Sequence, residues 1–385
     1  MKILVLSYEY PPVGSGGGII CKNLSETMAS QGHQVTVITA SLPGTVSMEL
    51  HNSENLNLVR LPSRRRHLHE SNPLEMLSWI SSTKKYFRQH VDTIDFDLCM
   101  AHFVLPGGEV ARWLKKKYAL QYIVVSHGHE IPWVHARKML LLHAASYCWL
   151  KQICRLSSAT FVQTRMMKEN IDRFVGKKHS QKNHIVPNGI SAEHFIHDYT
   201  KRPKKLRILF VGRMVLQKDP MTFLKAIRSL KGSPIDFEAR FIGDGKLRPR
   251  LERFVLRNNL GTKVHFLGRL SAEKMVQEYQ SAHIMVAPSL NEGMSVAALE
   301  ALSCGVYLIA SPASGYSEMI TEGVNGKIVN YGDVDGIVEE IRLFYNKGKM
   351  DDVLADAFLH SFRSKNSWRN IAQLYLDHFS RLLRK

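Results

Sequence analysis

The chain has 385 residues, of which 44% are hydrophobic and 22% carry a charged side chain. This length and balance exclude a disordered chain and predict two or three globular domains. The formal net charge of +18 either serves solubility alone or attracts phosphorylated ligands, anionic membranes or nucleic acid.

The first strand is predicted by the apolar run KILVLSYEY at residues 2–10. A glycine-rich loop, VGSGGGI at 13–19, a helical stretch over about 21–31 and a second strand, QVTVITA at 34–40, follow it. This order begins a doubly wound sheet. Three more strand-like runs occur in this half: IDFDLCMAHF (94–103), QYIVVSHG (121–128) and ATFVQT (159–164).

The same alternation returns after Pro203. The pattern predicts a helix at 219–230. The strands expected around it are LRILFVGR (206–213), ARFIGDG (239–245), VHFLGRL (264–270), HIMVAPS (283–289) and GVYLIASP (305–312). We therefore predict an α/β protein with two Rossmann-like domains, residues 1–187 and 188–365, facing each other across a cleft. Ligands of such sheets bind outside the carboxyl ends of the strands.

The segment NEGMSVAALEALSCG, residues 291–305, places two glutamates eight positions apart. Glu292 lies in a loop after a strand, and Glu300 lies within a helix expected at 295–304. The residues whose free backbone amides would form an anion site at the start of this helix are Gly293, Met294, Ser295 and Val296. We expect Glu300 to bind ribose hydroxyls and Glu292 to bind sugar hydroxyls, which is the layout of a nucleotide sugar.

Two other interpretations of these glutamates stay open. They are two unrelated solvated side chains, or the acid and nucleophile of a glycosidase, whose carboxyls must flank one scissile bond. Two cations favour the nucleotide sugar, because Arg213 ends a strand at the same edge and Lys218 lies five residues on. Together they would face the diphosphate, although either alone is also typical of a basic surface.

The first half offers further candidate residues. Gly17 and Gly18 would let backbone amides approach a ligand closely. Ile19 stands where a third glycine would complete the dinucleotide fingerprint, and the following strand ends without an acid, so a nicotinamide site is disfavoured. We expect His127 to point into the cleft, with a satisfied loop histidine as the alternative. Asp95-Phe96-Asp97 begins an apolar strand without partner ligands, so we predict no metal site.

These motifs, in this order, resemble the family-four retaining glycosyltransferases, which have the GT-B fold, over nearly the whole chain. Besides the glycine loop, the matching motifs are HG at 127–128, PNGI at 187–190, VGR and QKD within 211–219, GDG at 243–245 and EGMSVAALEAL at 292–302. The last resembles the family's E-x7-E motif. Met294 departs from the family, because a bulkier aromatic residue is frequent there.

The resemblance implies a role for each candidate residue. Arg213 and Lys218 would bind the donor diphosphate, and Glu300 would hold the ribose. Glu292 and His127 would lie beside the transferred sugar. The amides after Gly293 would meet phosphate, and Gly16 to Gly18 would line the donor and acceptor side. The resemblance also implies that residues 366–385 form a helix that crosses back onto the first domain.

The function expected from this resemblance is transfer of a hexosyl group from a nucleoside diphosphate sugar to a hydroxyl of a lipid-linked or polysaccharide acceptor, in bacterial cell-surface glycan synthesis. The donor is a co-substrate, and no other cofactor is expected. A nucleotide-sugar epimerase on the same fold and a basic nucleic-acid-binding protein are the alternatives. The second lacks a recognisable binding module, so we expect no nucleic acid.

Location follows from charge and cysteine content. The five cysteines form no Cys-x-x-Cys pair, and we see no signal peptide, which indicates the cytoplasm. Three basic segments, 64–67, 112–118 and 133–155, lie in the expected acceptor-binding domain. They fit a peripheral contact with an anionic membrane on the inner face of the plasma membrane. A solvated cluster at 64–67 and a packed core helix at 133–155 are the alternatives.

Overall fold

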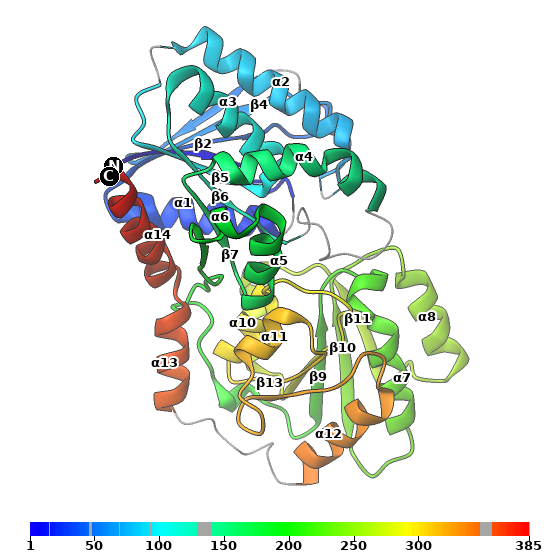
Figure 1. Cartoon of the computed structure of the whole chain (residues 1–385). Helices are drawn as coiled ribbons and strands as arrows, with labels where there is room; N and C mark the ends of the chain where they lie inside the picture. The colour runs from blue at the N-terminus through cyan, green and yellow to red at the C-terminus, as the bar shows by residue number, and fades with distance from the viewer. Residues whose placement is uncertain are drawn as a thin grey trace. The chain divides into compact units, whose positions relative to one another are not determined.

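The computed structural model describes residues 1–14, 16–45, 48–68, 70–91, 94–128, 140–346 and 356–384. These residues form two compact units, Met1–Asn188 with Trp368–Lys385, and Gly189–Ser367. Each unit is a sheet flanked by helices, as Figure 1 shows. The predicted α/β class with two parallel sheets is therefore confirmed.

The sheet of the first unit has the strand order β3-β4-β2-β1-β5-β6-β7-β8. Every neighbouring pair is parallel except β3 and β4, which are antiparallel. The strands are β1 (Lys2–Leu6), β2 (Gln34–Ala40), β3 (Glu49–Asn52), β4 (Leu56–Leu61), β5 (Leu98–His102), β6 (Tyr122–Val125), β7 (Ala159–Val162) and β8 (Asn183–Ile185). The strands β5, β6 and β7 are buried along their whole length, so their continuous apolar sequences fit a sheet covered on both faces.

The helices of the first unit include one that is separated from the others in sequence. They are α1 (Gly16–Ser30), α2 (Pro73–Gln89), α3 (Gly108–Tyr118), α4 (Leu140–Leu156), α5 (Arg165–Val175), α6 (Lys177–Ser180) and α14 (Trp368–Leu383). Although α14 follows the second unit in sequence, it lies beside α1 (Figure 1), and the side-chain amide of Gln31 donates to the carbonyl of Arg369 at 3.4 Å. One face of α14 is buried, with Tyr375 packed against Phe161 of β7.

The sheet of the second unit is parallel throughout, in the order β11-β10-β9-β12-β13-β14. Its strands are β9 (Leu206–Val211), β10 (Phe237–Ile242), β11 (Val264–Gly268), β12 (Ile284–Ala287), β13 (Tyr307–Ala310) and β14 (Gly326–Ile328). Its helices are α7 (Pro220–Leu230), α8 (Arg248–Arg257), α9 (Ala272–Gln280), α10 (Val296–Ser303), α11 (Ser314–Met319), α12 (Val334–Asn346) and α13 (Asp356–Asn366).

Each sheet has one point at which the strand order reverses. In the first unit β1 lies between β2 and β5. The strands β2 to β4 are added on one side of β1, and the strands β5 to β8 are added on the other side. In the second unit β9 lies in the same way between β10 and β12. Loops that leave two neighbouring strands in opposite directions create a crevice at the carboxyl edge, which is where ligands of open α/β sheets bind. A ligand-binding site is therefore expected at the loops that follow β1, β5, β9 and β12.

The glycine run differs from the predicted loop. Gly16, Gly17 and Gly18 form the first turn of α1 rather than a loop that precedes a helix at 21–31. A methyl group on Gly17 would lie 2.4 Å from the ring of Phe103, and one on Gly18 would lie 3.2 Å from the carbonyl oxygen of Val13. Close packing of this helical turn therefore explains two of the glycines better than loop flexibility does.

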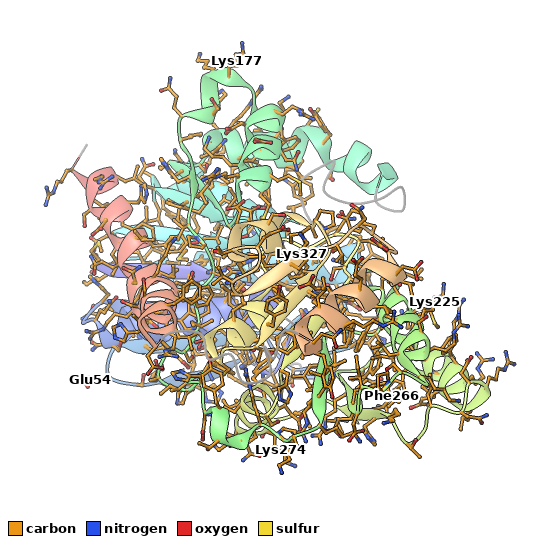
Figure 2. The ribbon with its side chains drawn as sticks, turned by 90° about the horizontal axis from the view of Figure 1, so that it is seen from below. Glu54, Lys177, Lys225, Phe266, Lys274 and Lys327 are labelled. Atoms are coloured by element: carbon orange, nitrogen blue, oxygen red, sulfur yellow. The ribbon has the colours of Figure 1, made fainter. Side chains whose placement is uncertain are left out.

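The basic surface also differs from prediction at one residue. Arg64, Arg66 and His67 are exposed, but Arg65 is buried over the ring of Tyr8, with its guanidinium donating to two backbone carbonyls. Elsewhere, Figure 2 shows lysines such as Lys177 extending from the surface. The expected basic segment 133–155 is described only from residue 140 onward. Among the described residues, no helix combines the length and the apolar character needed to cross a bilayer.

Candidate active site

The loops after β9 and β12 are tied together at the reversal point of the second sheet. The backbone amide of Leu290 donates to the carbonyl of Gln217 at 2.8 Å, and the side chain of Gln217 donates to the carbonyl of Asn291 at 3.0 Å. Beside these bonds the ammonium group of Lys218 forms an ion pair with the carboxylate of Glu292. The structure thus brings together two predicted site residues that are 74 positions apart.

The Lys218–Glu292 pair is shielded from water. Each side chain is only 16% exposed. Burial by itself would lower the pKa of Lys218, but the charge of Glu292, helped by Tyr316, outweighs this effect and raises the pKa above its ordinary value. Lys218 is therefore a cation at neutral pH. The alkyl chain of Lys218 packs beside Gly212, where an added methyl group would lie 3.7 Å from it. The φ of Gly212 is +151°, a backbone conformation that disfavours any larger residue at this position.

Arg213 adds a second positive charge beside this pair. Its side chain is exposed, and its charge is close enough to oppose protonation of Lys218. Within the described part of the chain its guanidinium forms no ion pair with a carboxylate. An exposed guanidinium beside a shielded ammonium group at a sheet's carboxyl edge suits a phosphate-containing ligand, because both groups donate hydrogen bonds to anionic oxygens.

The helix α10 begins directly after the Glu292 loop. Ser295 is its N-cap, and the side-chain oxygen accepts from the amide of Ala298 at 3.4 Å. The small and apolar sequence of α10 lets the helix pack closely on β12 and β13, so its N-terminal turn is fixed at the same edge. Gly293, Met294 and Val296, which are partly exposed, surround this turn. The partial positive charge of a helix N-terminus favours an anion there.

Two residues of α11 that were not predicted support this loop. A methyl group on Gly315 would lie 1.9 Å from the carbonyl oxygen of Gly293, so only glycine allows the approach. Tyr316 is buried, which raises the pKa of its hydroxyl, shares a hydrogen bond of 3.2 Å with Ser289, and lies close enough to Lys218 and Glu292 for both charges to act on it. The sequence could have indicated these two residues, because they follow the predicted strand that became β13. The carboxyl end of β13 lies at the same sheet edge as that of β12.

Glu300 lies within α10, apart from the Lys218–Glu292 pair. The hydroxyl of Tyr279 donates to its carboxylate at 3.1 Å. Burial raises the pKa of Glu300 to about 7, and this hydrogen bond offsets only part of the shift. The carboxyl group therefore changes its charge near neutral pH. Tyr279, at the end of α9, was not predicted because no motif marks it.

A second cluster lies at the reversal point of the first sheet. The ring of Phe103, directly after β5, packs against Gly17 and has its centroid 4.5 Å from that of His127, which follows β6. Phe103 has a φ of +66°, a strained conformation for a bulky residue that is typical of functional sites. The structure thus brings Gly17 and His127 together through a residue that sequence analysis missed.

His127 is paired with another histidine. Its Nε2 lies 3.1 Å from Nδ1 of His102, so one ring donates to the other. Burial lowers the pKa of His127 to about 4, and burial, together with repulsion from His127 when that ring is protonated, lowers the pKa of His102 well below its ordinary value. Both rings are therefore neutral at physiological pH. A neutral His127 can orient a ligand by hydrogen bonding but does not carry a charge.

Comparison with known proteins finds two family models that together match most of the chain. Residues 14–194 match the model of "Glycosyltransferase Family 4", and residues 191–357 match that of "Glycosyl transferases group 1". An uncharacterized glycosyltransferase of Methanocaldococcus jannaschii is 25% identical over 371 residues, which cover 96% of this chain and 95% of that protein.

Two solved structures have the same fold. Sucrose-phosphate synthase from Thermosynechococcus elongatus superposes with a TM-score of 0.84 at 21% identity and 99% coverage of both chains. Anabaena HepE in complex with UDP and glucose superposes with a TM-score of 0.77 at 14% identity, again with 99% coverage of both chains. The two family models together span residues 14–357, and the chain is therefore a glycosyltransferase of the family-four type with the GT-B fold.

Proposed function

We propose that the protein transfers a hexosyl group, with retention of configuration, from a nucleoside diphosphate sugar to a hydroxyl of a lipid-linked or polysaccharide acceptor. The setting that we propose is bacterial cell-surface glycan synthesis in the cytoplasm. The observation that carries the donor class is the shielded Lys218–Glu292 pair beside Arg213 and the N-terminus of α10. HepE was solved with UDP and glucose, which supports the same class of donor.

The barrier to this reaction lies in breaking the anomeric C–O bond, because negative charge then develops on the leaving diphosphate. Lys218, Arg213 and the amides of α10 stabilise that charge, so we propose that no metal is required. Glu292 both holds the ammonium group of Lys218 in place and accepts hydrogen bonds from sugar hydroxyls. Glu300 accepts from the ribose hydroxyls. The first unit, with Gly17, Gly18 and His127, binds the acceptor and orients the transferred sugar.

The experiment that tests this proposal is a donor panel. Sugar nucleotides built on UDP, GDP, ADP and dTDP are titrated into the protein by calorimetry, and release of the nucleoside diphosphate is followed in parallel, all with EDTA present. We expect one donor to bind and to be hydrolysed slowly without added metal. Absence of binding by every donor would refute the proposed substrate class, and turnover that appears only after Mg²⁺ or Mn²⁺ is added would refute the metal-free mechanism.

The pH dependence of donor binding tests the role of Glu300. Since its pKa is raised to about 7, Glu300 retains a proton below that pH, and a protonated carboxyl accepts fewer hydrogen bonds from ribose. The donor KM should therefore rise by up to about tenfold as pH falls from 8 to 6 and then level off at the value of the protonated form. Glu300→Gln, whose side chain is neutral like the protonated carboxyl, should raise KM at pH 8 to near the wild-type value at low pH and remove this dependence. An unchanged pH profile in that variant would exclude Glu300 from the donor site.

We further propose a peripheral contact with anionic membrane through the first unit. One shallow surface depression is lined by Arg64 and Lys85 together with Leu74 and Leu77, of which Leu74 is 73% exposed. Basic and apolar side chains on one surface suit a lipid interface. The double variant R64E/K85E should weaken binding to vesicles that contain phosphatidylglycerol at least about tenfold. The matched variant K225E/K274E should not, and equal binding to neutral vesicles would contradict the proposal.

A further inference from the structure

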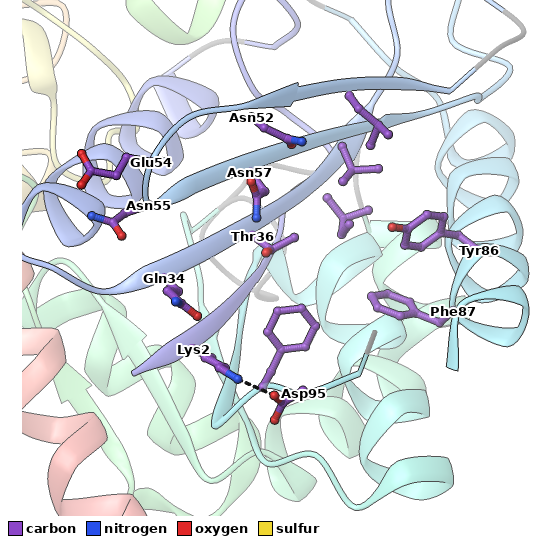
Figure 3. Close-up of a pocket in the computed structure, with 14 residues that line it drawn as sticks. Lys2, Gln34, Thr36, Asn52, Glu54, Asn55, Asn57, Tyr86, Phe87 and Asp95 are labelled. Atoms are coloured by element: carbon purple, nitrogen blue, oxygen red, sulfur yellow. Dashed lines mark hydrogen bonds and ion pairs between the residues drawn. The ribbon is translucent and has the colours of Figure 1, made fainter. Parts of the chain in front are cut away.

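The first unit contains a cavity that the proposed reaction does not use. Its volume is about 480 Å³, within the usual range for small-ligand sites. It lies over the strands β2, β3 and β4, with Lys2 and Gln34 at the amino ends of β1 and β2 (Figure 3). The glycine turn of α1 follows the opposite, carboxyl end of β1. A ligand in this cavity would therefore not occupy the Gly17–Phe103–His127 cluster.

The floor of the cavity consists of two parallel rows of side chains on one face of the sheet. Thr36, Asn57 and Asn52 face one another across β2, β4 and β3, because these residues are Cα partners in the strand register. The next row on the same face lies two residues further along each strand. In this row Ile38 is paired with Val59, and Val59 is paired with Leu50. A polar row thus borders an apolar row, since residues two apart share a face.

Aromatic side chains form the wall. Figure 3 shows Tyr86 and Phe87 projecting from α2 toward the strands. Tyr86 and Phe96 are half-buried and Phe87 is buried, and all three line the cavity. The cavity therefore combines an amide and hydroxyl floor with partly exposed aromatic rings.

The polar groups of this floor are available to a ligand. The side chains of Asn52 and Asn57 are exposed, and neither these side chains nor the hydroxyl of Thr36 hydrogen-bonds to another described residue. Lys2 is the only cation among the described residues that line the cavity, and its ammonium group forms an ion pair with Asp95. Glu54 adds a negative charge at the rim. This balance disfavours a phosphate and favours an uncharged ligand.

The chemistry that matches these features is that of a sugar. Each hydroxyl of a sugar ring both donates and accepts, and the amide of an asparagine offers both functions in one side chain. The C–H groups on the face of the ring need an apolar surface, which the exposed side chain of Leu50 and the partly exposed rings of Tyr86 and Phe96 supply, while Ile38 and Val59 are themselves buried. We propose that this cavity is a second saccharide-binding site, which holds one or two neutral sugar residues of a glycan chain away from the reacting centre. Its identification with the acceptor or product glycan rests on the proposed function; binding of the sugar does not.

The test is binding of neutral sugars to the full chain, observed by saturation-transfer NMR. The probes are methyl glycosides of glucose, galactose, mannose, rhamnose and N-acetylglucosamine, together with maltose and cellobiose, each with excess UDP present. We expect at least one probe to bind, and the variant N52A/N57A to weaken its binding about tenfold or more. The matched variant H51A changes an exposed residue on the opposite face of β3 and should bind as the wild type does.

The outcomes separate this proposal from the proposed function. Loss of sugar binding in N52A/N57A, with an unchanged rate of donor hydrolysis, supports the second site. If no probe binds the wild type, or if N52A/N57A binds as well as H51A does, the saccharide site is refuted even where donor hydrolysis is normal. Sugar binding in a protein that binds no nucleotide sugar would instead uphold this site and refute the proposed function.

Discussion

Replacing Lys218 by alanine should lower kcat/KM for the sugar nucleotide by about 10²–10³-fold, the effect of removing one preorganised charge donor from a transition state. The loss should be large because the ammonium group is shielded and keeps its charge through Glu292. Steady-state kinetics with the donor identified by the panel provide the measurement. Lys218→Arg keeps a positive charge and should recover part of the rate.

Stability should change less than turnover in Lys218→Ala. The carboxylate of Glu292 loses its partner in a largely buried position, so we expect about 1–3 kcal/mol of destabilisation. Thermal unfolding followed by circular dichroism separates this effect from catalysis. Lys225→Ala, at an exposed position on α7, is the matched control and should leave both quantities unchanged. Full turnover in Lys218→Ala would place the diphosphate elsewhere.

The second large effect is expected at Gly315, which no ligand needs to touch. Its added methyl group would lie 1.9 Å from the carbonyl oxygen of Gly293 and 2.7 Å from Cα of Met294, so the loop between β12 and α10 must move. Overpacking of this kind costs about 1–3 kcal/mol of stability. A displacement of about 1 Å at Glu292 should lower turnover by about 10²-fold.

Gly261→Ala is the control for Gly315→Ala, because no atom lies within 4 Å of its added methyl group. We expect this control to unfold at the wild-type temperature and to keep full activity. Donor affinity by calorimetry and nucleotide release by kinetics should both fall in Gly315→Ala. If Gly315→Ala folds and turns over donor as the control does, the position of the Glu292 loop does not matter for the reaction.

The buried strands were the part of the fold that sequence could predict. QVTVITA coincides with β2, and the expected apolar runs contain β5, β6, β7, β9, β11, β12 and β13, while β10 begins two residues before the run predicted at 239–245. The strands β3, β4, β8 and β14 were missed. In β3, Leu50, His51 and Asn52 are all exposed, so no apolar alternation marks it, and β14 has only three residues. The strands β3, β8 and β14 lie at sheet edges, where too little surface is buried to leave a strong pattern, whereas β4 lies inside its sheet and was missed although Val59 and Leu61 are buried.

The candidate site was predictable where a motif placed residues at a strand end. Lys218 and Glu292 each follow a predicted strand, and the structure places them together because both loops leave the same edge of the sheet. Tyr316, Tyr279 and Phe103 were missed because their importance comes from contacts across long sequence separations, which no single-chain motif records. The Lys218–Glu292 ion pair itself was also not foreseen, since both residues had been assigned to the ligand. Spacing along the chain does not tell whether two charged groups bind a third molecule or each other.

The return of α14 to the first unit has a consequence for biosynthesis. The ribosome makes the whole of Gly189–Ser367 before Trp368, so the second unit, which is continuous in sequence, can fold while the first still lacks a helix. Until that helix arrives, the surfaces that pack on Tyr375 and Phe379 stay open to water and to chaperones. We therefore expect nascent chains that stop before residue 368 to retain protease-sensitive sites within their first 188 residues, and full-length chains to lose them.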